Sequence, residues 1–375
     1  MRRILLHSFS NSLVITLALL AVPSNASGAG TVIAWCGDSV GQLDACATNV
    51  VAIATGYQQS LLLKSDGTVA DCGTFWEQEA SIPITVPVGL SNVVSVAGGY
   101  SHSLALKADG TVVVWGSNTY GQTNVPPDLT NVVAISAADY HSLALKADGT
   151  VATWGSPGYP VPAGLVDVVA ISAGTANLAL RGDGTVVGWG SSSTLSSSLA
   201  GLSNIVAISY GWSGGWDEWY AVTADGTVLG YFHPANLTNI VAVCASSGTD
   251  HHVNLAIKAD GTVIGWGFNF CGGQMVPPGL SNVVAVSSDS THSLALVGDG
   301  PPVLHGLLTN PARDSDGFSV SVPTQNGKVY RLEYKNSISD ANWIPLPLVA
   351  GNGHVQTLTD THVTGEQRFY HVRQW

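Results

Sequence analysis

Tyrosine and tryptophan side chains stand where short turns are expected in this sequence, and these residue types dominate the binding surfaces of proteins. A tyrosine follows a run of small apolar residues in three successive segments, and residues 210–219 add three tryptophans and two acids. The pattern predicts a surface that binds a partner through aromatic rings. The candidate binding residues are Tyr57, Trp76, Tyr100, Tyr120, Tyr140, Trp212, Trp216, Asp217, Trp219, Phe268 and Phe270.

Histidines recur at one position of the sequence. His102, His141 and His292 each precede an apolar strand, and this recurrence predicts a shared hydrogen bond within each repeat rather than chemistry. The run Asp250–His252 contains metal-ligand types, but adjacent residues of an extended chain point to opposite faces, and no third ligand is evident. We therefore expect no metal site.

Neither the cysteines nor any common catalytic motif points to catalysis. Five cysteines are an odd number, so one thiol at least is free or pairs between chains. Cys36 and Cys46 flank a short loop and are a possible disulfide, with Cys72 as an alternative partner. Neither a phosphate-binding loop nor a Cys-x-x-Cys pair occurs. The sequence favours binding over catalysis, leaves an enzymatic role open, and gives no sign of a cofactor.

The elements that must carry these residues repeat along the chain. An Asp-Gly pair recurs seven times at intervals of 35 to 43 residues. An alternating apolar strand precedes most pairs, and Thr-Val with a strand that usually ends in Trp-Gly follows, which is a hairpin signal. A further apolar run lies upstream of each hairpin. The pairs begin at Asp66, Asp109, Asp148, Asp183, Asp225, Asp260 and Asp299.

Each repeat therefore predicts a small antiparallel sheet, which buries its faces when several are arranged radially. The upstream half occurs seven times but the Asp-Gly-Thr half only six times, and residues 31–37 resemble the missing half. We expect this N-terminal strand to complete the blade of residues 283–300. The predicted fold is all-β: a seven-bladed β-propeller closed by the N-terminal strand, followed by a small C-terminal β-sandwich-like module.

The alternating strand directions sort the loops between two edges. Loops after the apolar run and loops after Trp-Gly lie at one edge of each sheet, and the Asp-Gly turns lie at the other. All the candidate aromatic residues belong to the first edge. The sequence therefore predicts one aromatic-rich face.

The unit from Asn131 to Gly155, together with the run from Trp115 to Gln122, resembles the regulator of chromosome condensation repeat family. The resemblance covers residues 31–300 and implies a seven-bladed propeller. Among exported bacterial members, the sequence is similar in style to the propeller-type β-lactamase inhibitor proteins, which bind an enzyme through an aromatic-rich face. The resemblance implies the propeller fold and a role in binding other proteins, and it assigns no catalytic residue.

Three regions follow from the composition along the chain. Residues 1–29 read as a signal peptide, with Arg2 and Arg3 before the apolar run Leu13–Val22 and small residues after it. Residues 30–302 form the predicted propeller. Residues 303–375 no longer follow the repeat and predict a small β-rich module. We expect a secreted, periplasmic or cell-surface protein.

Charge narrows the classes of partner. Without Arg2 and Arg3, 11 basic residues face 25 acidic ones, so phosphate backbones are repelled. No apolar run remaining after signal cleavage is long enough to insert in a membrane. We expect a monomer that binds a protein partner, with inhibition of an exported enzyme as one version. A carbohydrate-binding or enzymatic propeller and a structural cell-surface protein are the alternatives.

Overall fold

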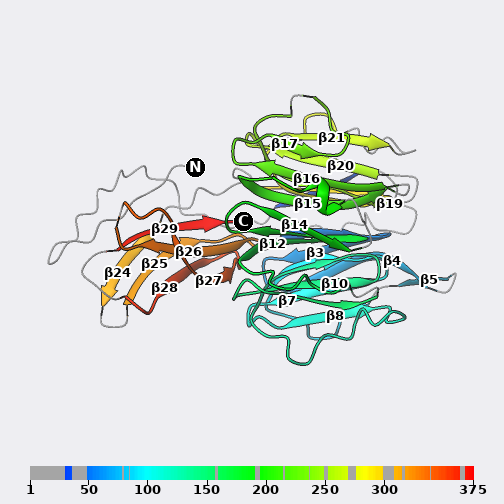
Figure 1. The fold of residues 1–375 in the computed structure, drawn as a ribbon. Helices are drawn as coiled ribbons and strands as arrows, with labels where there is room; N and C mark the ends of the chain where they lie inside the picture. Colours follow the sequence, from blue (N-terminus) through cyan, green and yellow to red (C-terminus); the bar gives the residue numbers. More distant parts are fainter. Residues whose placement is uncertain are drawn as a thin grey trace.

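The computed structural model describes most of the chain after its first 29 residues (Figure 1). The predicted signal peptide and the pair Cys36 and Cys46 lie outside the described residues. The described ranges are 30–35, 49–77, 80–83, 85–156, 159–190, 195–213, 216–235, 237–248, 252–268, 276–298, 308–314, 317–337, 339–363 and 368–375.

Strands dominate the described residues and form seven separate sheets between residues 30 and 298. The first four sheets hold β2 (Val50–Gly56), β3 (Gln59–Lys64), β4 (Val69–Glu77) and β5 (Ala80–Pro83); β6 (Val93–Gly98), β7 (His102–Lys107) and β8 (Val112–Gly116); β9 (Val132–Ala137), β10 (His141–Lys146) and β11 (Val151–Gly155); and β12 (Val168–Ala173), β13 (Ala176–Arg181) and β14 (Val186–Gly190). The last three hold β15 (Ile205–Ser213), β16 (Trp216–Thr223), β17 (Val228–Gly230) and β19 (Ser247–Gly248); β18 (Ile240–Cys244), β20 (His252–Lys258) and β21 (Val263–Phe268); and β22 (Val283–Ser288), β23 (Ser293–Val297) and β1 (Thr31–Trp35).

Six of the seven Asp-Gly pairs form turns between the second and third strands of their sheets, and the seventh, at Asp299, lies outside the described residues. In the second sheet, Asp109 accepts hydrogen bonds from the backbone N–H of Thr111 at 3.0 Å and from its hydroxyl at 2.6 Å. Gly110 has a φ of +79°, which a residue with a Cβ rarely adopts. The carboxylate is therefore occupied by its own turn, as the turn chemistry predicts.

Each sheet buries its faces against its neighbours, and the leucines of the second strands form the interior. Leu61, Leu104, Leu143, Leu178 and Leu255 are fully buried. The strands of each sheet contact those of the next, and β22 and β23 contact β2. The fold is therefore a β-propeller, which buries apolar sheet faces without a second layer.

The N-terminal strand belongs to the last sheet. β1 pairs antiparallel with β23, in a register that sets Val32 opposite Leu296 and Ala34 opposite Leu294. Val32 and Ala34 also pack on the apolar cluster that Leu294 shares with Val50 of the first sheet. The strand thus joins residues that are more than 250 positions apart in the sequence.

Hydrogen bonds link neighbouring sheets at the start of the second strands. His102 Nε2 lies 3.0 Å from Ser142 Oγ, and His292 Nε2 lies 2.8 Å from Ser60 Oγ. The predicted shared hydrogen bond of these histidines is present, but its placement within one repeat was wrong. It joins two repeats because the ring points across the buried sheet interface. Burial lowers the pKa of His102 to about 3, so its imidazole is neutral.

The C-terminal residues form two further three-stranded sheets with their own apolar cluster. Their strands are β24 (Thr309–Asp314), β25 (Gly317–Pro323) and β28 (Val355–Asp360), and β27 (Ile344–Ala350), β26 (Val329–Lys335) and β29 (Phe369–Gln374). The predicted boundary between residues 302 and 303 lies outside the described residues and stays a prediction. α1 (Leu195–Ser198) is the one helix among the described ranges, and its four residues are too few to cross a membrane.

These C-terminal sheets, here called the module, lie against one edge of the propeller (Figure 1). The N–H of Leu348 donates to the carbonyl of Ala147 at 2.9 Å, and Asn326 donates to the carbonyl of Val94 at 3.1 Å. Ala147 precedes an Asp-Gly turn and Val94 lies at the same end of its sheet. The module therefore covers part of the edge that carries the Asp-Gly turns, here called the Asp-Gly edge.

A buried arginine anchors the module to the fourth sheet. Arg331 is 5% exposed and pairs with Glu333 at 2.7 Å and with Asp167 of the propeller. A Cβ on Gly182 would lie 2.4 Å from Arg331 Nη2. Asp167 departs from the repeat, because the six other repeats have asparagine at its place. At the place of Gly182 four repeats have alanine, and only the last repeat also has glycine, at Gly298. The asparagines are Asn49, Asn92, Asn131, Asn204, Asn239 and Asn282, and the alanines are Ala108, Ala147, Ala224 and Ala259.

We predict that Val32→Asp destabilises the propeller by about 2 kcal/mol or more, because it places an unpaired charge in the apolar contact between the first and last sheets. Thr31→Asp is the matched control, since Thr31 is exposed in the same strand. Thermal and denaturant unfolding measure both. Equal effects of the two substitutions would show that β1 adds little to the stability of the propeller.

We predict that Gly182→Ala costs about 1–3 kcal/mol, because its Cβ overpacks against Arg331. In an Arg331→Ala background the same substitution should cost less, since Arg331 is gone and the Asp167 carboxylate, whose Oδ2 would lie 2.7 Å from the new Cβ, is released from its ion pair and can move away. Calorimetric unfolding of the four proteins in this cycle gives the coupling. The same loss in both backgrounds would contradict a role for Gly182 in admitting the arginine.

Candidate functional site

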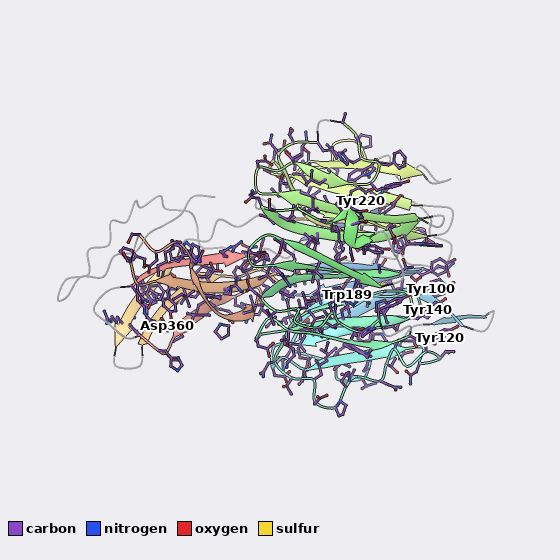
Figure 2. All side chains as sticks on the ribbon, in the orientation of Figure 1. Tyr100, Tyr120, Tyr140, Trp189, Tyr220 and Asp360 are labelled. Carbon is purple, nitrogen blue, oxygen red and sulfur yellow. The ribbon has the colours of Figure 1, made fainter. Side chains whose placement is uncertain are left out.

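Four tyrosines from three neighbouring sheets form a continuous row of rings, and Figure 2 labels three of them, Tyr100, Tyr120 and Tyr140. The centroids of Tyr57 and Tyr100 lie 4.5 Å apart with nearly parallel planes at 13°. Tyr100 and Tyr140 lie 5.8 Å apart, and Tyr140 and Tyr120 lie 4.5 Å apart. We call these rings the tyrosine row and the edge that carries them the tyrosine edge.

Turn position explains why these rings meet. Tyr57, Tyr100 and Tyr140 each lie between the first and second strands of their sheets, and Tyr120 follows the third strand of the second sheet. Those turns lie at the end of the strands opposite to the Asp-Gly turns. The tyrosine edge and the module therefore occupy opposite ends of the propeller, as Figure 2 shows for Tyr120 and Asp360.

Two glycines let neighbouring turns approach closely enough for the rings to touch. A Cβ on Gly56 would lie 2.4 Å from the carbonyl oxygen of Gly99, and a Cβ on Gly99 would lie 2.4 Å from that of Ala138. The N–H of Tyr57 donates to the carbonyl of Gly99 at 3.2 Å. The backbone thus fixes the spacing of the row, and the row is preorganised for a partner.

The environment of the row disfavours negative charge. Burial raises the pKa of Tyr100 to about 12, with further contributions from Tyr57, Tyr140 and Asp139. Burial also raises the pKa of Tyr140 and that of Asp139 beside it. Tyr120 keeps 49% of its surface exposed. At neutral pH Tyr100 and Tyr140 are therefore neutral phenols, with the Asp139 carboxyl next to them.

The segment 210–219 is not the loop that the sequence analysis placed there. Its described residues, 210–213 and 216–219, are the paired ends of β15 and β16, with Tyr210 opposite Trp219 and Trp212 opposite Asp217. Strand pairing is favoured over a loop here because it gives hydrogen-bond partners to backbone N–H and C=O groups that a loop would leave unpaired. Asp217 accepts a hydrogen bond from the Tyr210 hydroxyl.

The tryptophans of this hairpin contribute to the interior. Trp212 and Trp219 are partly buried and pack on the largest apolar cluster of the propeller. They are not brought to the tyrosine row by any described ring contact. The structure thus gives these two residues a packing role, while their binding role stays a prediction.

Glu218 takes the place that histidine has in other repeats. It is buried, and its carboxylate accepts a hydrogen bond at 3.1 Å from Asn254 of the next sheet.

Gly211, Ser213 and Gly215 have the Gly-x-Ser-x-Gly spacing of a hydrolase elbow. Such an elbow joins a strand to a helix, whereas Gly211 and Ser213 end a strand that pairs with β16. The spacing alone therefore carries no catalytic assignment.

Several predicted residues lie outside what the structure describes. The backbone of Trp76, Trp216 and Phe268 lies in strands, but their side chains are outside the described part, as is all of Phe270. The same holds for the run Asp250–His251. Within the described ranges, no group of three or more His, Cys, Asp and Glu residues is placed to hold a metal.

Sequence reasoning missed one buried carboxyl group. Asp71 accepts hydrogen bonds at 3.2 Å from Ser103 and from the Trp115 indole of the next sheet. Its other oxygen, Oδ1, is buried without a described hydrogen-bond partner. Burial raises its pKa to about 7. The signal was present, because the corresponding third-strand positions hold Val114 and Thr153.

The comparisons with known proteins agree with the fold. Residues 93–122 and 132–159 match the family model of the Regulator of chromosome condensation (RCC1) repeat. No curated protein is similar enough in sequence to match.

Solved structures match a larger part of the chain. Human WBSCR16 covers 72% of this chain and 99% of its own, at 18% identity and a TM-score of 0.54. The CRINKLY WD40 ectodomain of the Arabidopsis thaliana receptor kinase ACR4 covers 67% and 92%, at 23% identity and a TM-score of 0.48. Prp20p of Saccharomyces cerevisiae, which binds Gsp1p and histones, covers 67% and 69%, at 19% identity and a TM-score of 0.40. Only the first superposes at a TM-score above 0.5, and it shows a shared fold alone.

We predict that Asp71→Asn gains stability relative to the wild type as pH rises between about 4 and 7, because the Asp71 carboxyl makes only the wild type less stable over this window, while the buried histidines act on both proteins alike. In that window the folded protein keeps a proton on Asp71 that the unfolded chain, with an ordinary pKa of 3.8, has lost. At pH 8 the variant should be more stable by on the order of a few kcal/mol. Denaturant unfolding across the window measures the difference. A wild-type slope that persists in the variant would contradict the assignment.

Proposed function

We propose that this chain is an exported protein that binds another protein through its tyrosine edge. The observation that carries the proposal is the continuous tyrosine row, which draws four rings from three sheets to the edge away from the module. Tyrosine rings are typical anchors of protein interfaces. The fold does not need rings in these turns, because the corresponding turn of the fourth sheet holds Thr175.

The propeller is suited to hold such a surface rigid. We propose that its seven sheets form one closed ring, supported by the pairing of β1 with β23 and by the bond between His292 and Ser60. A closed ring has no free end at which sheets could separate. The loss of freedom on binding is therefore small, which favours a stable complex.

Export and the nature of the partner belong to the same proposal. The basic, apolar and small-residue order of residues 1–29 is typical of a signal peptide, and supports the proposal that the protein acts in the periplasm, outside the cell or at its surface. One version of the function is inhibition of an exported enzyme, in which the tyrosine edge covers the enzyme's active site. It predicts a stable complex and no turnover.

Affinity capture from the native secretome and envelope tests the proposal. The wild-type protein should recover a protein partner that Tyr57→Ala/Tyr120→Ala does not, because two anchor rings contribute about 1–2 kcal/mol or more each. Lys258→Ala, at the Asp-Gly edge, is the control and should recover the partner as wild type does. Recovery of the same proteins by all three would sink the proposal.

A further inference from the structure

The positive charges of the propeller are confined to one edge. Between residues 30 and 298 the sequence holds five Lys or Arg residues, and each stands at the end of a second strand, just before an Asp-Gly turn. Two of them pair with the turn itself, Lys107 with Asp109 at 3.1 Å and Lys146 with Asp148 at 3.5 Å. The five are Lys64, Lys107, Lys146, Arg181 and Lys258.

None of these five Lys and Arg residues therefore lies at the tyrosine edge. The second strands of the first four sheets are six residues long, or about 17 Å at ~3.3 Å per residue. This is about twice the Debye length of ~8 Å at physiological salt. The lysines of the far edge are screened from a ligand at the row, whereas the carboxyl of Asp139 lies beside it.

From this charge separation we infer that the partner presents lysine or arginine side chains to the tyrosine row. The inference rests on the proposed function and names the chemistry of its partner. A cation gains from the face of an exposed ring, about 0.5–2 kcal/mol, and from the phenol oxygens as hydrogen-bond acceptors. A cation at the row would also offset the burial that raises the pKa of Asp139, and so favour its carboxylate form. An anionic segment would meet neither a cation nor a compensating charge at this edge.

In the module, two arginines are each held between an aromatic ring and a carboxylate. The Arg368 guanidinium lies 4.0 Å from the centroid of the Tyr334 ring and pairs with the buried carboxylate of Asp360. Arg373 lies 4.6 Å from the Trp375 ring and 3.8 Å from Glu333. In both cases an aromatic ring and a carboxylate share one arginine. The tyrosine row and Asp139 offer the same two kinds of group, an aromatic ring and a carboxyl. The arginine or lysine would come from the partner.

A labelled hexa-arginine peptide tests the inference against its neutral hexa-citrulline counterpart by fluorescence anisotropy. Hexa-arginine should bind the wild-type protein, and hexa-citrulline about tenfold or more weakly. Tyr57→Leu/Tyr120→Leu should weaken hexa-arginine binding about tenfold, the loss of two cation-ring contacts. Asp139→Asn should weaken it about threefold, and Asp128→Asn, which removes the same charge from an exposed turn elsewhere, should leave it within about twofold.

Two results would overturn the inference. One is equal hexa-arginine binding by the Leu double variant, which would indicate general attraction to an acidic protein. The other is binding of hexa-citrulline or chitohexaose as tight as that of hexa-arginine. Adding excess hexa-arginine to the capture experiment separates the two proposals: it should displace the partner. Capture that needs the tyrosines but resists hexa-arginine would overturn the cationic partner and leave protein binding intact, whereas capture independent of the tyrosines would remove the proposed function itself.

Discussion

The structure depends on the burial of both faces of small sheets against their neighbours. A three-stranded sheet cannot cover its own apolar faces, so each repeat is stable only when the next one packs on it. The buried polar residue at the start of a second strand makes this packing specific. His102 and Ser142 must lie within hydrogen-bond distance, because an unpaired buried polar group costs about 1–3 kcal/mol. The same contact sets how neighbouring turns are aligned, and so determines that Tyr57, Tyr100 and Tyr140 can meet.

Much of the fold could be predicted from the sequence because the same local patterns of turn residues and alternating apolar residues recur in several repeats. The Asp-Gly turns, the buried leucines and the two edges all follow from strand alternation and turn chemistry. The contacts of the tyrosine row could not be predicted. They depend on how closely the backbones at Gly56 and Gly99 approach the next turn, and this is a property of the packed sheets rather than of one repeat.

The errors share a physical cause. Residues 210–219 differ in length and composition from other turns, and the sequence analysis treated this difference as a loop. Strand pairing extended instead, and Glu218 became buried where a histidine stands elsewhere. The histidines were assigned a bond within one repeat, although their rings reach the next. In both cases a rule drawn from one repeat missed an interaction that exists only between repeats.

Departures from the repeat are therefore where this sequence carries information beyond its fold. Asp167 departs in one blade, and together with Gly182 it admits Arg331 of the module. Asp71 departs in another and leaves a carboxyl group buried beside Trp115. The tyrosines occupy turns of only three sheets, and the repeat itself supplies cations only at the opposite edge. Since the positions that build the blades are already engaged by their neighbours, we expect a surface for a partner to arise from such departures, and the tyrosine row is one that brings rings of three sheets together.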